Sequence, residues 1–81
     1  MQLLLVEDDQ PLADSLRQAL QKKGYAVNHV DNGNSALHTL RVERPDILIL
    51  DIGLPDMDGI SVLKKLRVSD KTLPVLLLTA R

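Results

Sequence analysis

The chain has 81 residues, 44% of them apolar, and its 10 basic and 11 acidic side chains leave a net charge of -1. This composition is typical of one folded domain with an ordinary charged surface, and it excludes a disordered chain or a strongly basic nucleic-acid-binding surface. The sequence contains no cysteine, which excludes disulfides and thiolate metal clusters. Its apolar runs are too short to cross a bilayer and its first residues lack the basic start of a signal peptide, so we expect a cytoplasmic protein with no membrane partner.

Apolar runs alternate with segments of helical period along the chain, and this alternation is typical of repeated βα units. Residues 3–6 form a continuous apolar run that predicts a first strand. Apolar side chains then recur at helical spacing over residues 12–20, and Gly24 ends the predicted helix. Residues 25–30 predict a second strand, whose polar positions favour a place at the edge of the sheet.

The second half of the chain continues this alternation. The expected elements are a turn at 31–34, a helix around 36–40 that ends before Pro45, a strand at 47–50, a helix over 60–66 capped by Asp58, and a strand at 75–79 opened by Pro74. The strand at 47–50 is uniformly apolar, as a parallel strand covered on both faces should be. We therefore place it in the centre of the sheet.

The expected strand order brings together acids that are far apart in the sequence. Crossover connections between parallel strands are right-handed, and with the order 2-1-3-4 the first and third strands are neighbours. We therefore predict an α/β fold, a doubly wound parallel sheet of four strands with three helices. Ligands bind such sheets outside the carboxyl ends, where the strand order reverses. Glu7, Asp8 and Asp9, which follow the first strand, and Asp51, which follows the third, are expected to share that crevice.

Close-set carboxylates repel one another unless one is protonated, water solvates them or a cation neutralises them. Oxygen ligands without cysteine or a spaced histidine pair favour Mg2+ or Mn2+ over zinc. Taken singly, an acid triplet at residues 7–9 is typical of a solvated helix start, and an aspartate at a strand end can be structural. Their convergence at one predicted switch point favours a metal site.

Four motifs in this order and spacing resemble the receiver domain of bacterial two-component response regulators. They are Val6-Glu7-Asp8-Asp9, the strand 47–50 ending in Asp51, the loop Leu54-Pro55-Asp56-Met57-Asp58-Gly59, and Pro74-Val75-Leu76-Leu77-Leu78-Thr79-Ala80-Arg81. The last two are most similar to the winged-helix (OmpR/PhoB-like) subfamily, whose receivers precede a DNA-binding domain. The resemblance covers the whole chain and implies a flavodoxin-like (CheY-like) fold that is incomplete here.

The resemblance implies that Asp51 is the phosphoacceptor, a carboxylate nucleophile that takes a phosphoryl group from a sensor histidine kinase. It implies Mg2+ held directly by Asp8, Asp51 and the backbone carbonyl of Gly53, and through water by Glu7. Thr79 matches the switch hydroxyl of the family, which turns toward the new phosphoryl oxygens. The implied output is transcriptional control, with DNA bound only by an output domain outside this chain.

In the family, the domain continues with another helix, a fifth strand that carries a phosphate-contacting lysine, and a last helix used for dimerisation. The resemblance therefore implies that residues 1–81 are the N-terminal portion of a single receiver domain, and we expect the full-length protein to form a homodimer. The strand at 75–79 is expected to be an uncovered apolar edge, and Lys64, Lys65 and Lys71 cannot replace the family's lysine. We expect weak or absent phosphoryl transfer for the 81-residue chain alone.

Several residues near these motifs are expected to shape the site or to have no role in it. Asp9 is expected to face the start of the following helix and not the ion, and Pro55 is expected to shape its loop. We assign no role to His29 and His38, which are expected to lie away from the crevice. Gly53 leaves room beside the acceptor for water, so a Gly53→Met replacement is expected to alter the lifetime of the phosphorylated form.

Two other functions remain open. One is a vestigial, non-phosphorylated interaction module, and the other is a Mg2+-dependent phosphohydrolase that resembles the haloacid dehalogenases. Such hydrolases place a second acid two residues after the nucleophile, where this chain has Gly53. We therefore expect a signalling switch and not an enzyme that turns over outside substrates. A Mg2+ titration separates the switch from a vestigial module, in which no saturable response is expected.

Overall fold

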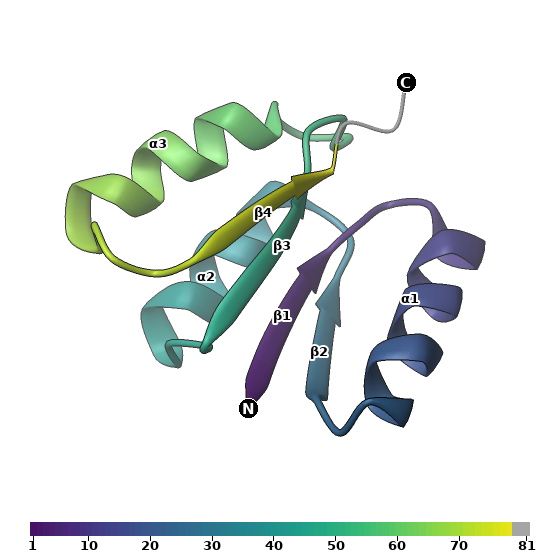
Figure 1. Cartoon of the computed structure of the whole chain (residues 1–81). Coiled ribbons are helices and arrows are strands. Elements are labelled where there is room, and N and C mark those ends of the chain that lie inside the picture. The colour runs from purple at the N-terminus through teal and green to yellow at the C-terminus, as the bar shows by residue number, and fades with distance from the viewer. Residues whose placement is uncertain (79–81) are drawn as a thin grey trace.

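The computed structural model describes residues 1–78, and residues 79–81, which include Thr79, lie outside the described part of the chain. Four strands alternate with three helices (Figure 1). In chain order they are β1 (Gln2–Val6), α1 (Gln10–Lys22), β2 (Ala26–Val30), α2 (Gly33–Val42), β3 (Ile47–Asp51), α3 (Gly59–Ser69) and β4 (Val75–Leu78). Every predicted strand and helix is therefore present. None of the helices described is long and apolar enough to cross a membrane.

The strands form one parallel sheet in the order β2-β1-β3-β4, which confirms the predicted order. β1 and β3 lie in the centre, and β2 lies at an edge as expected. Val6 on β1 is in register with Leu50 on β3. The two central strands therefore end side by side, at the edge where doubly wound sheets bind ligands.

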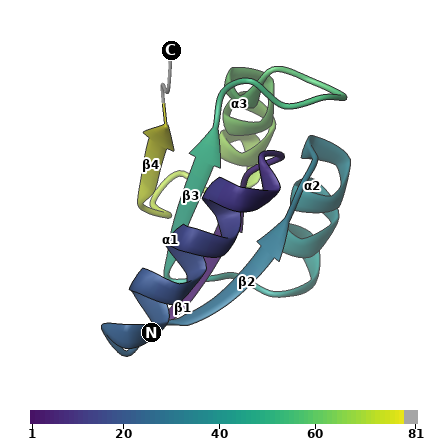
Figure 2. The same cartoon turned by 90° about the vertical axis from the view of Figure 1, so that its right-hand side faces the viewer.

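Helices cover the two faces of the sheet unequally, with α1 on one face and α2 and α3 on the other (Figures 1 and 2). Leu3 and Leu5 of β1 belong to a buried cluster with Ala13 of α1. Leu4 and Val6 belong to a second buried cluster, formed with residues of α2 and α3. Because successive side chains of a strand point to opposite faces, the continuous apolar run of β1 is buried on both.

Each helix is preceded by a capping residue whose side chain accepts a hydrogen bond from a backbone N–H of the first turn. Asp9, Asn32 and Asp58 cap α1, α2 and α3, which confirms the predicted cap at Asp58. The turn expected at residues 31–34 was wrong in its second half, because α2 already begins at Gly33. Asn32 is the capping residue, so the helix starts earlier than its apolar period indicated.

β4 forms the second edge of the sheet, and its one strand partner among residues 1–78 is β3. Leu76 on this strand is 57% exposed. An apolar hollow of about 290 Å³ lies beside it, lined by Leu3, Leu20, Tyr25, Ile47, Ile49, Pro74, Val75 and Leu76. The apolar edge expected for the last strand is therefore seen in the described part of the chain.

Candidate metal centre

Three carboxylates meet at the carboxyl ends of the two central strands. Glu7 and Asp8 directly follow β1, and Asp51 is the last residue of β3. One oxygen from each of the three side chains lies within 4.8 Å of the other two. The convergence predicted from the strand order is therefore confirmed for these three residues.

The three acids differ in their access to water. Glu7 and Asp51 are each 2% exposed, whereas Asp8 is exposed. Burial raises the pKa of Glu7 above its ordinary value, and the neighbouring Asp51 and Asp8 carboxylates raise it further. The ion pairs formed within residues 1–78 involve other acids. In the described part of the chain, the charge of the cluster is therefore not neutralised by a basic side chain.

Backbone amides orient the two buried carboxylates. The N–H of Asp9 donates to Oε2 of Glu7 at 3.1 Å, and the N–H of Gly53 donates to Oδ1 of Asp51 at 3.3 Å. Asp9 does not join the cluster, so the expectation that all four acids share the crevice was wrong for this residue. Its side chain instead accepts from the N–H of Leu12, as expected for a helix cap. Each buried acid is thus held through one oxygen by the loop that follows its strand.

The path of the chain after Asp51 depends on a close backbone approach. The N–H of Gly59 donates to the carbonyl of Ile52 at 2.8 Å, which holds the start of α3 against the end of β3. A Cβ at residue 59 would collide with the Asp51 carbonyl oxygen and would lie 2.7 Å from Cα of Ile52. Glycine is therefore required at this position, and it fixes both ends of the loop over residues 52–58.

The donor set fits a hard divalent cation. The three side chains offer carboxylate oxygens, the ligands that Mg2+ and Mn2+ prefer, and the set includes no thiolate or imidazole. Buried carboxylates without a cationic partner are costly even when a backbone amide donates to them, and a bound cation relieves that cost. Glu7, Asp8 and Asp51 are therefore the residues that could hold such an ion.

The roles predicted for Gly53 and Thr79 are not tested by the structure. Gly53 lies beside the cluster through the bond from its N–H to Asp51, and its carbonyl as a metal ligand stays a prediction. Thr79 lies outside the described residues, so its role as the switch hydroxyl also stays a prediction.

Sequence reasoning missed two contacts, one with the backbone of Glu7 and one between the loop after β3 and the start of α2. His29 was expected to lie away from it, but the ring Nε2 lies 2.8 Å from the carbonyl oxygen of Glu7. The pairing of β2 with β1, which sets His29 opposite Leu5, was the one available signal for this contact. Asp56, expected only to be part of a loop, accepts hydrogen bonds from the backbone at the start of α2. No periodic pattern marks a contact of that kind.

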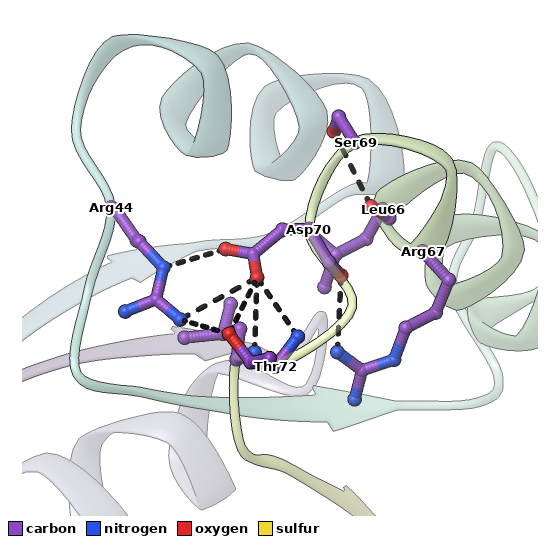
Figure 3. Close-up of polar contacts among 7 residues, drawn as sticks. Arg44, Leu66, Arg67, Ser69, Asp70 and Thr72 are labelled. Atoms are coloured by element: carbon purple, nitrogen blue, oxygen red, sulfur yellow. Dashed lines mark hydrogen bonds and ion pairs between the residues drawn. The ribbon is translucent and has the colours of Figure 1, made fainter.

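A second polar cluster lies at the opposite end of the sheet, where β3 and β4 begin (Figure 3). The Asp70 carboxylate accepts from Nε of Arg44 at 2.6 Å and from the N–H groups of Thr72 and Leu73 at 3.1 and 3.0 Å. Arg67 donates to the backbone carbonyl of Asp70 at 3.2 Å. The hydrogen bond from Arg44, with those from Thr72 and Leu73, lowers the pKa of Asp70 from 3.8 to about 2. This carboxylate is neutralised within the chain.

Comparison with known proteins gives a consistent result. A family model of the response regulator receiver domain matches residues 3–81. The transcriptional regulatory protein TctD of Salmonella typhimurium is 49% identical over all 81 residues of the chain. The chain covers 36% of TctD, so it spans about a third of the length of this relative.

Solved structures share the fold. The response regulator protein TrrA from Thermotoga maritima, in complex with Mg2+–BeF, matches 99% of this chain with a TM-score of 0.94 and 32% identity, over 70% of its own chain. TrrA in complex with the histidine kinase ThkA matches 98% of this chain with a TM-score of 0.91 and 33% identity, over 68% of its own chain. Because the family model spans nearly every residue and the strands superpose on a solved response regulator, the chain belongs to the response regulator receiver domain family.

Proposed function

We propose that the chain acts as the phosphoacceptor receiver of a two-component signalling system. A carboxylate oxygen of Asp51 attacks the phosphorus of a phosphohistidine on a sensor histidine kinase. The phosphorus–nitrogen bond breaks, and its electron pair leaves with the imidazole. The product is an acyl phosphate on Asp51, and the output is a change of conformation, not a released metabolite.

The side chains of the cluster have separate roles in this proposal. Asp8, Asp51 and the Gly53 carbonyl hold a divalent ion directly, and Glu7 holds it through water. Bound Mg2+ or Mn2+ screens the acids and stabilises charge on the phosphoryl oxygens. The N–H of Gly53 keeps Asp51 oriented for attack, and the Thr79 hydroxyl turns to bond the new phosphoryl oxygens.

One observation carries the proposal. Three carboxylates, two of them buried, share a site that no basic side chain of residues 1–78 neutralises by an ion pair. Such repulsion destabilises a fold, and it also blocks the approach of a negatively charged phosphoryl group. A cation removes both effects at once, so the arrangement favours metal-dependent chemistry on Asp51 over a structural role.

The proposed partners extend what is known of similar proteins. TrrA is seen in complex with the histidine kinase ThkA, and TctD is a transcriptional regulatory protein. By analogy, a sensor histidine kinase in the cytoplasm delivers the phosphoryl group to this chain. The full-length protein acts as a homodimer and binds DNA through an output domain outside residues 1–81.

A Mg2+ titration followed by amide chemical shifts tests the metal centre. We expect saturable shifts at Asp8 and Asp51 in the wild-type chain and a clear loss of affinity in Asp51→Asn. The matched control is Asp14→Asn, which changes an acid of α1 that is paired with Arg17. No saturable response in the wild-type chain would identify a vestigial interaction module and overturn the proposal.

Phosphoryl transfer is best measured in a chimera in which residues 1–81 replace the matching part of TctD. With acetyl phosphate and Mg2+, we expect one hydroxylamine-labile phosphoryl group on Asp51, located by mass spectrometry. Asp51→Asn and removal of Mg2+ should each abolish the label, and Asp14→Asn should retain it. Repeated release of phosphate from an added phosphomonoester would instead indicate a phosphohydrolase.

A further inference from the structure

The side chain of Asp56 joins the loop after β3 to the first turn of α2. Its Oδ1 accepts from the N–H of Gly33 at 2.7 Å, and its Oδ2 accepts from the N–H of Asn34 at 2.8 Å. Amides at the start of a helix have no partner within the helix, and the helix dipole favours negative charge there. The hydrogen bonds from Gly33 and Asn34 lower the pKa of Asp56. Both oxygens of one carboxylate thus hold the helix to the loop.

Met57 packs at the same junction. A Cβ at Gly33 would collide with Cγ of Met57 and would lie 2.8 Å from its Sδ. Met57 also packs against the buried cluster that contains Ala36 of α2 and Val62 of α3. Two successive residues of the loop therefore contact the start of α2, one by hydrogen bonds and one by packing. The loop cannot separate from α2 without breaking both contacts.

The base of the same loop is attached to the acid cluster. Gly53 donates to Asp51 and forms an isolated antiparallel bridge with Asp58 across the loop. The N–H of Gly59 donates to the carbonyl of Ile52 at 2.8 Å. Residues 52–58 are therefore held at the base by β3 and α3 and at the tip by α2. Gly53 lies in the sequence between Asp51 and the residues that contact α2, and its own contacts are with Asp51 and Asp58 at the base.

We propose that Asp56 is a positioning residue for the metal centre, because it holds the loop to α2 and thereby fixes Gly53 beside Asp51 in the arrangement that binds the ion. This inference rests on the proposed function and deepens it, since it assigns a determinant of ion affinity outside the acid cluster. A freed loop has more conformations to lose when the ion binds, so the affinity falls. The first turn of α2 thereby becomes part of the site.

The test compares Mg2+ affinity, from amide shift titrations of the full chain, in the wild type and two variants of Asp56. Asp56→Ala removes both acceptors, and we expect binding to weaken about tenfold, at the lower end of the range for groups that orient metal ligands. Asp56→Asn keeps one neutral acceptor, so its Mg2+ affinity should lie between those of the wild type and Asp56→Ala. Without Mg2+, hydrogen exchange at the Gly33, Asn34 and Gly53 amides should be faster in both variants.

Two control variants separate positioning from charge and from stability. Asp31→Asn removes a charge just before α2, where the Asp31 carboxylate accepts from the side chain of its neighbour Asn32 and not from the loop. Asp70→Ala removes an aspartate of similar hydrogen bonding at the opposite end of the sheet. Both variants should bind Mg2+ with close to wild-type affinity.

Each outcome gives a decision. Wild-type affinity in Asp56→Ala, with faster exchange at Gly33, overturns the inference and leaves the proposed function intact. Equal weakening in Asp31→Asn or Asp70→Ala also overturns it, because charge or stability then explains the loss. Absence of saturable binding in the wild-type chain overturns the proposed function, and the inference with it. If Asp56→Ala does not fold, Asp56→Asn against Asp31→Asn decides, since both make the same chemical change.

Discussion

At the amino end of the sheet, Asp70 is surrounded by donors from Arg44 and two backbone amides (Figure 3). At the carboxyl end, Glu7 and Asp51 are buried beside a third acid, Asp8. The pKa of a carboxyl group is shifted in opposite directions at the two ends. The pKa of Asp70 is lowered, chiefly by Arg44, whereas burial raises the pKa of Glu7. A carboxylate that serves the fold has its counter-ion within the chain. The carboxylates of the acid cluster have no counter-ion among the described residues, so a bound cation could supply it.

The largest expected effect tests whether the acid end is held by backbone packing. Gly59→Val should lower the free energy of unfolding by about 3 kcal/mol, because the branched side chain overlaps the Asp51 carbonyl and Ile52. The measurement is urea unfolding without Mg2+. Gly33→Ala is the matched control, since its new methyl group meets the flexible end of Met57 and should cost about 1 kcal/mol. Equal losses would contradict a rigid contact at Gly59.

The next effect concerns the repulsion within the acid cluster. Without Mg2+ at pH 7, Glu7→Gln should raise the free energy of unfolding, because the folded state disfavours ionised Glu7. Because the pKa of Glu7 is raised in the folded state, its protonated form favours folding below pH 4.5. This stability is lost as the pH rises through the folded-state pKa. The advantage of Glu7→Gln should therefore shrink as the pH falls toward 4.5.

Addition of Mg2+ should reverse the ranking of these two proteins. At a concentration about 100 times the dissociation constant, a ligand that binds only the folded state adds roughly 2.7 kcal/mol to the free energy of unfolding. The wild-type chain should show this gain in urea unfolding, and Glu7→Gln should gain less because its site holds the ion more weakly. Equal gains in both proteins would show that Glu7 takes no part in ion binding.

The smallest expected effect lies at the amino end. The pKa of Asp70 is about 2 in the folded chain against 3.8 ordinarily, so its contribution to stability is fully present above pH 3.8 and is lost as the pH falls through 2. Asp70→Asn should be less stable than the wild type at pH 7 in thermal unfolding, and the difference should shrink as the pH falls through 2. Arg44→Gln should remove most of the same pH dependence. Parallel stability profiles for wild type and Asp70→Asn would contradict this expectation.

Much of the fold and the acid cluster could be predicted because each depends on a local pattern. The uniformly apolar run at residues 47–50 predicts a strand covered on both faces, and the structure places it in the centre of the sheet. With the expected order 2-1-3-4, β1 and β3 are neighbours, so the residues that end them meet, as the structure shows. Glu7, Asp8 and Asp51 could be brought together once that strand order was assumed.

Contacts between loops could not be predicted in this way. Asp56 accepts a hydrogen bond from Gly33, 23 residues away in the sequence, and Arg44 donates one to Asp70, 26 residues away. These separations follow from the packing of α2 against α3 and of the turns at their ends, and no periodic pattern records them. His29 was missed for a related reason, since its contact with Glu7 depends on side-chain direction at the edge of the sheet.

The acid cluster draws its members from opposite halves of the chain, with Glu7 and Asp8 near the beginning and Asp51 beyond the middle. Neither segment alone carries the complete set of oxygens, so chelation requires that β1 and β3 have already paired. Under the proposed function, a nascent chain that has emerged only as far as α2 lacks Asp51 and so cannot bind the ion with the full set of ligands. Mg2+ binding would then require that the central strand pair has already closed.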